Sequence, residues 1–148
     1  MTEVFCLDAA VWVKWLTPEE FSDVAATLVL DSAVHRRVAP AFCWAEVGST
    51  LRKKADAGSI SHERAEDAWQ LFIETPISFI DSRRLRARAW QLAREFAQPT
   101  LYDAAYLACT EVVDAEVRSF WTTDDVLLQS LGDRRPPYVR HLREVAAG

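Results

Sequence analysis

Short apolar runs alternate along the chain with longer segments in which apolar residues recur every three or four positions. The short runs predict buried strands at residues 4–7, 37–39, 77–80 and 117–122, with a weaker fifth strand near 138–139. The periodic segments predict helices that begin at or just after residues 8, 18, 41, 61, 82, 100 and 124. This alternation predicts an α/β protein, a three-layer α/β/α sandwich around a mostly parallel sheet of about five strands.

Several helix starts carry their own signals. Pro18 is expected to open the second helix, with acidic residues in its first turn. Pro99 and Thr100 give an entry and an N-cap for a helix whose apolar stripe includes Leu101 and Ala105. In the helix over 41–57, Trp44, Val47 and Leu51 are expected to mark the buried face.

Length and composition favour an ordinary globular protein. The chain has 148 residues, of which 50% are hydrophobic and 26% charged, so we expect one domain over 1–148. No apolar run reaches the roughly 18 residues of a membrane span, and the acidic start of the chain does not resemble a signal peptide. Cys6, Cys43 and Cys109 are far apart among apolar neighbours, which predicts buried, reduced thiols and a cytoplasmic location.

The charge balance limits the partners. A net charge of −5 argues against a protein that coats nucleic acid generally, but it allows a local grip on a phosphate chain. Two basic clusters, at 52–54 and 83–88, are either solvated faces or contacts for RNA or an acidic partner. No glycine-rich phosphate loop is present, so a nucleotide-cofactor fold of the usual kind is not expected.

Four acidic residues stand out by their positions. Asp8 and Asp124 each follow a predicted strand, where they either cap the next helix or line a site at the end of the sheet. Glu46 lies among apolar residues with no basic residue three or four positions later, and the alternative is a surface glutamate at the edge of the stripe. Asp103 lies in the first turn of a small-residue helix, where it also fits a capping box with Thr100.

Together these acids predict a cation site. Right-handed crossovers bring the ends of the first and fourth strands to one edge of a parallel sheet, where Asp8 and Asp124 meet. Two carboxylates at about 5 Å repel by roughly 3 kcal/mol at an effective dielectric of 20, so four of them need a counter-charge. Oxygen ligands favour Mg²⁺ or Mn²⁺, and such an ion supports phosphodiester hydrolysis.

The ordered set of acids resembles the four acidic motifs of PIN-domain nucleases over nearly the whole chain, most closely those of VapC toxins. The matching segments are Leu-Asp8-Ala-Ala-Val-Trp, Trp-Ala-Glu46-Val, Leu-Tyr-Asp103-Ala-Ala-Tyr-Leu-Ala and Thr-Thr-Asp124. The resemblance implies a PIN-like fold and a site made of Asp8, Glu46, Asp103 and Asp124, supported by Thr122 or Thr123. It also implies Mg²⁺-dependent or Mn²⁺-dependent cleavage of RNA that leaves 3′-hydroxyl and 5′-phosphate ends, a VapB-type antitoxin as partner, and a homodimer.

Two departures from the family pattern and several alternatives remain open. The loop before the Asp103 helix lacks the glycine often found there, and Asp125 directly follows Asp124. Asp125 either adds a ligand to the site or only caps a helix, and we favour the cap. A PIN nuclease that processes RNA without an antitoxin, or a silent PIN-like binding module, fits the same pattern. A receiver-like or phosphatase-like protein requires a late lysine, and none follows Asp125.

Overall fold

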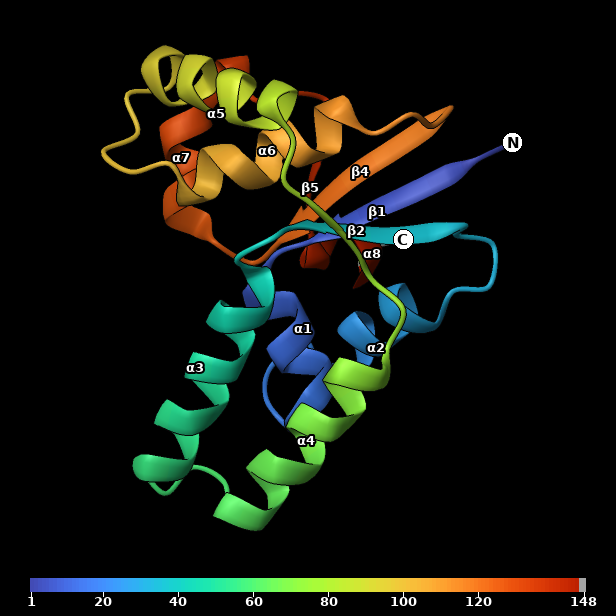
Figure 1. Ribbon diagram of the computed structural model, residues 1–148, viewed down its shortest axis with the longest axis vertical. Helices are drawn as coiled ribbons and strands as arrows, with labels where there is room; N and C mark the ends of the chain where they lie inside the picture. The colour runs from blue at the N-terminus through green and yellow to red at the C-terminus, as the bar shows by residue number, and fades with distance from the viewer. Residues whose placement is uncertain (147–148) are drawn as a thin grey trace.

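A computed structural model describes residues 1–146, and Figure 1 shows one sheet with helices on both sides. The strands are β1 (Glu3–Leu7), β2 (Arg36–Pro40), β3 (Ser78–Ile80), β4 (Val117–Thr122) and β5 (Val139–His141). The helices are α1 (Ala9–Leu16), α2 (Ser22–Leu30), α3 (Cys43–Asp56), α4 (His62–Glu74), α5 (Arg83–Glu95), α6 (Tyr102–Val112), α7 (Asp125–Leu131), the short 3₁₀ helix η1 (Gly132–Arg134) and α8 (Leu142–Ala146).

The five strands form a single sheet in the order β3-β2-β1-β4-β5, and every neighbouring pair is parallel. β1 is central, and its last residue, Leu7, lies opposite Trp121 of β4. The residues that follow β1 and the last residues of β4 therefore lie at the same edge of the sheet. The prediction of a mostly parallel sheet of about five strands is confirmed.

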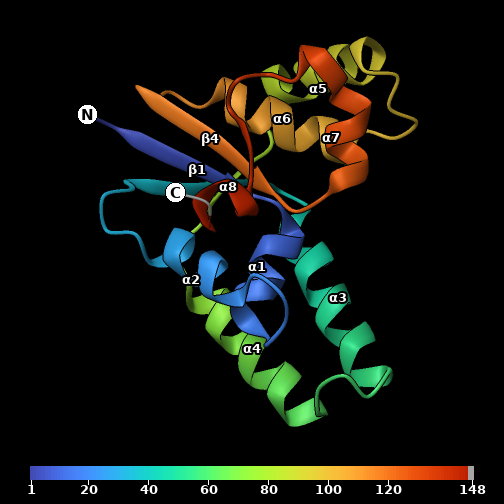
Figure 2. The ribbon, with the colours of Figure 1, turned by 180° about the vertical axis from the view of Figure 1, so that it is seen from behind.

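Two layers of helices cover the sheet. α5, α6 and α7 lie on one face, and α1, α2 and α8 lie on the other (Figures 1 and 2). α6 contacts β1, β2 and β4 directly, because small residues such as Ala104, Ala105 and Ala108 let its backbone approach the strands. α3 and α4 form an antiparallel pair that extends away from the sheet.

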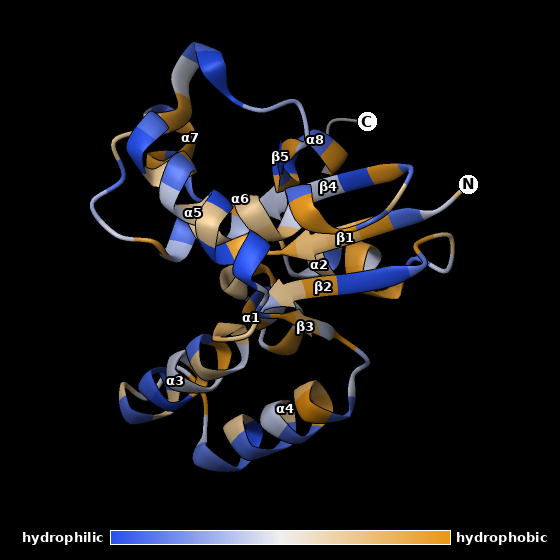
Figure 3. Ribbon diagram, turned by 45° about the horizontal axis from the view of Figure 1, so that its top comes forward, coloured by the Kyte–Doolittle hydropathy of each residue, from blue (hydrophilic) through white to orange (hydrophobic). Residues whose placement is uncertain are grey.

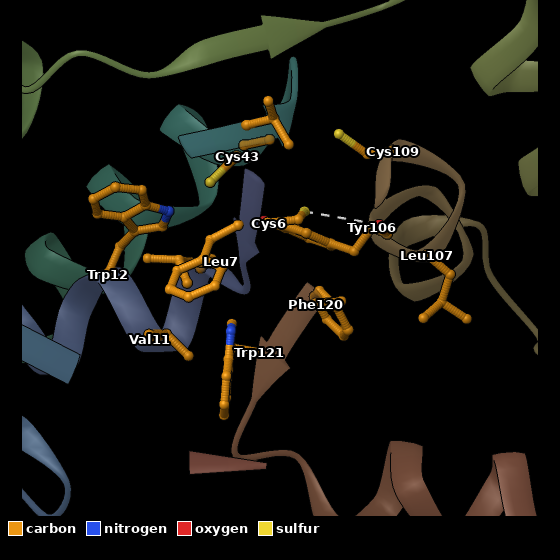
Figure 4. Close-up of a cluster of buried hydrophobic side chains, with 14 of the residues drawn as sticks. Cys6, Leu7, Val11, Trp12, Cys43, Tyr106, Leu107, Cys109, Phe120 and Trp121 are labelled. Atoms are coloured by element: carbon orange, nitrogen blue, oxygen red, sulfur yellow. Dashed lines mark hydrogen bonds between the residues drawn. The ribbon is translucent and has the colours of Figure 1, made fainter. Parts of the chain in front are cut away.

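The core is built around the central strands (Figure 4). Leu7 and Phe120 from the strands pack with Trp12 of α1 and Tyr106 of α6, all at most 2% exposed. The ring of Trp12 meets that of Phe72 edge-on at 5.7 Å, which ties α4 to α1. The three cysteines are buried and form no disulfide bond, as their apolar neighbours predict.

The start of α2 differs from the prediction. The helix begins at Ser22 rather than at Pro18, because Phe21 adopts a left-handed conformation with φ of 68° before the first turn. The residues between belong to a turn in which Glu19 binds two lysines, with Nζ to carboxylate oxygen distances of 2.7 Å to Lys14 and 2.7 Å to Lys54. Those two lysines therefore join the turn to α1 and α3, and they share the single negative charge of Glu19.

Two expected core residues are on the surface instead. Trp44 is 53% exposed, because the buried face of α3 runs through Cys43, Val47 and Leu51, one position away from it. Leu101 is 44% exposed, because it is the N-cap residue of α6 and precedes the helical stripe. Thr100 is therefore not the N-cap, contrary to the prediction. Within residues 1–146, no helix is both long and apolar enough to cross a membrane.

Candidate active site at the carboxyl edge of the sheet

Four acidic side chains occupy the edge of the sheet where β1 and β4 end. Asp8 follows β1, and Asp124 comes two residues after β4. Glu46 comes from the first turn of α3 and Asp103 from the first turn of α6. All four are half-buried. The negative charges of Glu46, Asp103 and Asp124 are each close enough to Asp8 to raise its pKa. The structure thus brings the predicted residues together.

Asp8 is held by its neighbours in the sheet. Its backbone N–H donates to the carbonyl of Trp121 at 3.0 Å, which extends the β1–β4 pairing by one step. Asp8 is the N-cap residue of α1, yet its side chain makes no capping hydrogen bond. Oδ2 instead accepts a hydrogen bond from the Thr122 hydroxyl at 2.8 Å. The carboxylate is therefore turned toward β4 and the other acids rather than along α1.

Thr122 and Asp124 continue this network. The hydroxyl oxygen of Thr122, which is fully buried, accepts a hydrogen bond from the Asp124 N–H at 3.0 Å. Asp124 caps α7, because its Oδ1 accepts from the Leu127 N–H at 3.0 Å. Capping uses one carboxylate oxygen of Asp124 and leaves the other free for the acidic group. Of the two threonines named by the resemblance, Thr122 makes the supporting contact.

Glu46 is oriented by a residue that sequence reasoning missed. The phenol of Tyr106, on α6, donates to Glu46 Oε1 at 2.7 Å. Tyr106 is almost completely buried, and its ring also packs edge-on against Phe42 at 5.8 Å. The only sequence signal was a tyrosine one helical turn after Asp103, on the same face of α6. Glu46 is therefore a fixed, half-buried group and not a mobile surface glutamate.

Of the four acidic side chains, that of Asp103 has the fewest contacts that hold it in place. The N-cap of α6 is Leu101, and no side chain caps this helix, so the capping box predicted as an alternative is absent. Its carboxylate accepts no hydrogen bond from any of residues 1–146, although it is half-buried. A half-buried carboxylate without a partner is costly unless a positive group meets it.

Burial and mutual repulsion weaken the charged forms of these acids. Burial, with the nearby Asp103, Glu46 and Asp124, raises the pKa of Asp8 to about 6 despite the hydrogen bond from Thr122. Burial also raises the pKa of Glu46, although the Tyr106 hydroxyl opposes the shift. The pKa of Asp103 is raised by burial and then by Asp124 and Glu46. None of the four acids forms an ion pair with a described residue.

The donor set fits a hard divalent cation in an open site. Carboxylate oxygens are the ligands that Mg²⁺ and Mn²⁺ prefer. Within the described part of the chain, no three Asp, Glu, His or Cys side chains already converge closely enough to enclose an ion. Mg²⁺ commonly binds through one or two carboxylates and keeps several waters, so a closed cage is not required.

Asp125 does not belong to this group and does not cap α7, contrary to the prediction. The cap is Asp124, and Asp125 is the first helical residue. Its carboxylate pairs with Arg143 at 3.0 Å and lies 3.6 Å from Nε2 of the buried His141. Asp125 thus joins α7 to the end of β5 and to α8.

Comparison with protein families assigns the fold. The PIN domain family model matches residues 5–129, which span all four acids. The chain belongs to the PIN domain family.

A solved structure shares this fold. A chain in the crystal structure of VapBC2 from Rickettsia felis, bound to a DNA fragment from their promoter, superposes on this PIN domain with a TM-score of 0.59. The match covers 93% of this chain and 98% of that chain at 15% sequence identity. Curated protein sequences give no significant match. PIN domains are nucleases, so the acidic edge lies in a fold that supports hydrolysis of nucleic acid.

Replacing Thr122 by valine tests how the hydroxyl supports Asp8. Valine has nearly the same shape but cannot donate to Oδ2, so the charged form of Asp8 loses stabilisation of about 1.5 kcal/mol or more. We expect the pKa of Asp8 to rise by about one unit above its wild-type value. Carboxyl ¹³C titration in EDTA measures the midpoint. Thr27→Val, which removes an exposed hydroxyl from α2, is the matched control, and an unchanged midpoint in Thr122→Val would contradict the assignment.

The raised pKa of Asp8 predicts how pH changes the stability of the metal-free protein. Between its ordinary pKa of 3.8 and its folded value of about 6, the folded state keeps a proton that the unfolded state has released. Stability should therefore fall as pH rises through this window. In EDTA, Asp8→Asn should gain on the order of 2 kcal/mol relative to wild type between pH 4 and pH 7. Urea unfolding at both pH values measures the difference, and a constant difference would show that Asp8 is not perturbed.

Proposed function

We propose that this PIN domain is a Mg²⁺-dependent or Mn²⁺-dependent endoribonuclease whose cation is held by Asp8, Glu46, Asp103 and Asp124. One observation carries the proposal: four half-buried carboxylates share one edge of the sheet, and no described cationic side chain neutralises them. A fold that assembles such a group tolerates it when a divalent ion supplies the positive charge.

The protein's own groups prepare the site for that ion. The Thr122 hydroxyl holds the Asp8 carboxylate in place, and the Tyr106 phenol does the same for Glu46. Capping of α7 fixes one oxygen of Asp124, while the carboxylate of Asp103 is free of protein hydrogen bonds. When bound, a divalent cation lowers the pKa of a coordinated water and neutralises charge on a phosphate oxygen.

The substrate and partner are also proposals. Because one structural neighbour is a chain of VapBC2, we propose that the chain is the toxin of a VapBC-type pair. In this proposal it is a single PIN domain over 1–148 that works as a homodimer and is silenced by a VapB-type antitoxin. A cavity of about 580 Å³ lies between α3 and α4, lined by the exposed Trp44 and by Trp69. An apolar or aromatic antitoxin segment fits this groove, and a basic side chain from it would complement the acids.

The nuclease proposal is tested with purified protein, Mg²⁺ and a single-stranded RNA. We expect internal cuts that leave 3′-hydroxyl and 5′-phosphate ends, mapped by sequencing RNA 5′ ends with and without phosphatase treatment. RNA that binds but remains intact under these conditions would instead identify a silent binding module.

The toxin proposal is tested separately in cells. Expression of the chain should stop growth, and co-expression of the small neighbouring gene should restore it. If the chain cleaves RNA in vitro but does not affect growth, the toxin proposal is wrong. The protein is then an RNA-processing nuclease that works without an antitoxin.

A further inference from the structure

The outward face of α5 carries a stripe of arginines interrupted by one tryptophan. Arg83, Arg86, Trp90 and Arg94 follow one another at spacings of three, four and four residues, which places them on one side of a helix with 3.6 residues per turn. A neighbouring side of the helix, formed by Leu85, Ala89, Leu92 and Ala93, is buried against the rest of the fold. We call these four outward residues the α5 stripe.

The charges of the α5 stripe are largely uncompensated. Among the described residues, neither Arg83 nor Arg94 has an acidic partner, and Arg86 makes only a long, exposed contact of 3.5 Å with Asp81. Arg88 differs, because its guanidinium is fixed on Glu111 at 2.6 Å and belongs to the α5–α6 packing. In a chain of net charge −5, this concentration of free guanidinium groups favours a negatively charged ligand.

Trp90 indicates what kind of anion fits. Its side chain is 61% exposed and makes no ring contact with a described aromatic residue. An exposed indole between guanidinium groups matches a single nucleic-acid strand, in which phosphates alternate with stackable bases. A purely acidic peptide would use the arginines but would leave the indole without a stacking partner.

The α5 stripe leads toward the acidic edge. α5 packs along α6, the helix that begins with the Asp103 turn, and a short loop joins the end of α5 to the start of α6. In that loop, Gln98 donates to Ser130 of α7 at 2.7 Å, so the end of α5 lies beside the helix that Asp124 caps. Arg134 also lies at this end, but its guanidinium is held by Glu95 of α5, with 2.8 Å to the backbone carbonyl and 4.0 Å to the carboxylate, so it is not counted among the free cations. Figure 3 shows α5 at the front of the molecule with no other part of the chain covering it.

We propose that the α5 stripe is a second RNA-contact surface, which binds the phosphates of single-stranded RNA on one side of the cleaved bond while Trp90 stacks on a base. From Arg83 to Arg94 the stripe runs about 16 Å along the helix axis, at a rise of 1.5 Å per residue. This inference rests on the proposed ribonuclease function and names the substrate as an unpaired strand that extends beyond the scissile phosphate.

The test measures RNA binding without cleavage. In the Asp103→Asn background, the affinity for a fluorescent single-stranded RNA is followed by anisotropy over a range of salt concentrations. Arg83→Gln/Arg94→Gln should bind about tenfold more weakly and lower the slope of log K against log salt by about 1.4, since each lost phosphate contact contributes roughly 0.7. Arg36→Gln/Arg64→Gln, which removes two exposed arginines from β2 and α4, is the matched control and should bind nearly as well as its parent.

Trp90 has its own signature. Trp90→Ala should weaken binding to single-stranded RNA several-fold with little change in the salt slope, and Trp90→Phe should restore part of it. Binding to an RNA duplex should be weaker than to the single strand and insensitive to Trp90, because paired bases are not free to stack.

The results separate this inference from the proposed function. If wild type cleaves RNA and the α5 double variant binds RNA like the matched control, the α5 surface is not an RNA contact and the nuclease stands. If that variant keeps its RNA affinity but loses neutralisation by the antitoxin, the stripe binds an acidic protein and the inference is wrong. If wild type neither binds nor cleaves RNA, the proposed function itself fails.

Discussion

Removal of divalent cations is expected to abolish RNA cleavage by this PIN domain. In excess EDTA, the four carboxylates repel one another and no described basic side chain takes the place of the ion. The activated water and the neutralised phosphate oxygen both depend on the cation, so the rate should fall by several orders of magnitude. Timed cleavage of a labelled RNA with EDTA, and again after Mg²⁺ or Mn²⁺ is returned in excess, measures the effect.

The control for this experiment is a measurement that the protein stays folded without the cation. The fold rests on an apolar core, and the three free cysteines are part of that core. The chain should therefore remain folded in EDTA, as measured by circular dichroism. Returning the cation should raise the melting temperature, because a ligand that binds only the folded state stabilises it. Cleavage that persists in excess EDTA by a folded protein would reject the metal mechanism.

Asp103→Asn is expected to separate activity from stability. Asparagine has nearly the shape of aspartate but removes one of the charges that would hold the cation, so cleavage should fall by orders of magnitude. Because no hydrogen bond to Asp103 is lost, the melting temperature in EDTA should not fall, and relief of repulsion from Glu46 and Asp124 should raise it. Cleavage rates in Mg²⁺ and melting curves in EDTA give the two readouts.

Asp125→Asn is the matched control for this variant. It makes the same chemical change next to Asp124, but the lost charge is that of an exposed residue paired with Arg143. A partly exposed ion pair of this kind contributes little, on the order of 1 kcal/mol or less, and cleavage should be unchanged. A folded Asp103→Asn protein that cleaves at the wild-type rate would remove Asp103 from the site.

The sequence predicted the layout of the sheet because its central strands, β1 and most of β4, are buried on both faces. Apolar runs such as 4–7 and 117–122 have no helical periodicity, and their alternation with helices leaves a parallel sheet as the simple solution. The meeting of Asp8 and Asp124 at one edge then followed from the direction of the strands. The order and direction of the strands therefore predicted where Asp8 and Asp124 lie, while their roles as cation ligands remain a proposal.

Contacts between segments that are far apart in the chain could not be predicted from the sequence. The hydrogen bond from Tyr106 to Glu46 joins residues 60 positions apart, and that from Thr122 to Asp8 joins residues 114 apart. No local pattern encodes such pairs, since they depend on how α3, α6 and β4 pack. The start of α2 was predicted too early for the same reason. Glu19 forms ion pairs with two lysines on other helices, and this tertiary contact overrides the local signal of Pro18.

The central claim is that the acidic edge binds a divalent cation, and calorimetric titration of Mn²⁺ into the metal-free protein at pH 7 tests it most directly. The account predicts saturable binding by wild type and by Asp125→Asn, with affinity at least tenfold lower in Asp103→Asn. Equal affinity in all three proteins, or no binding by a folded wild-type chain, would contradict it.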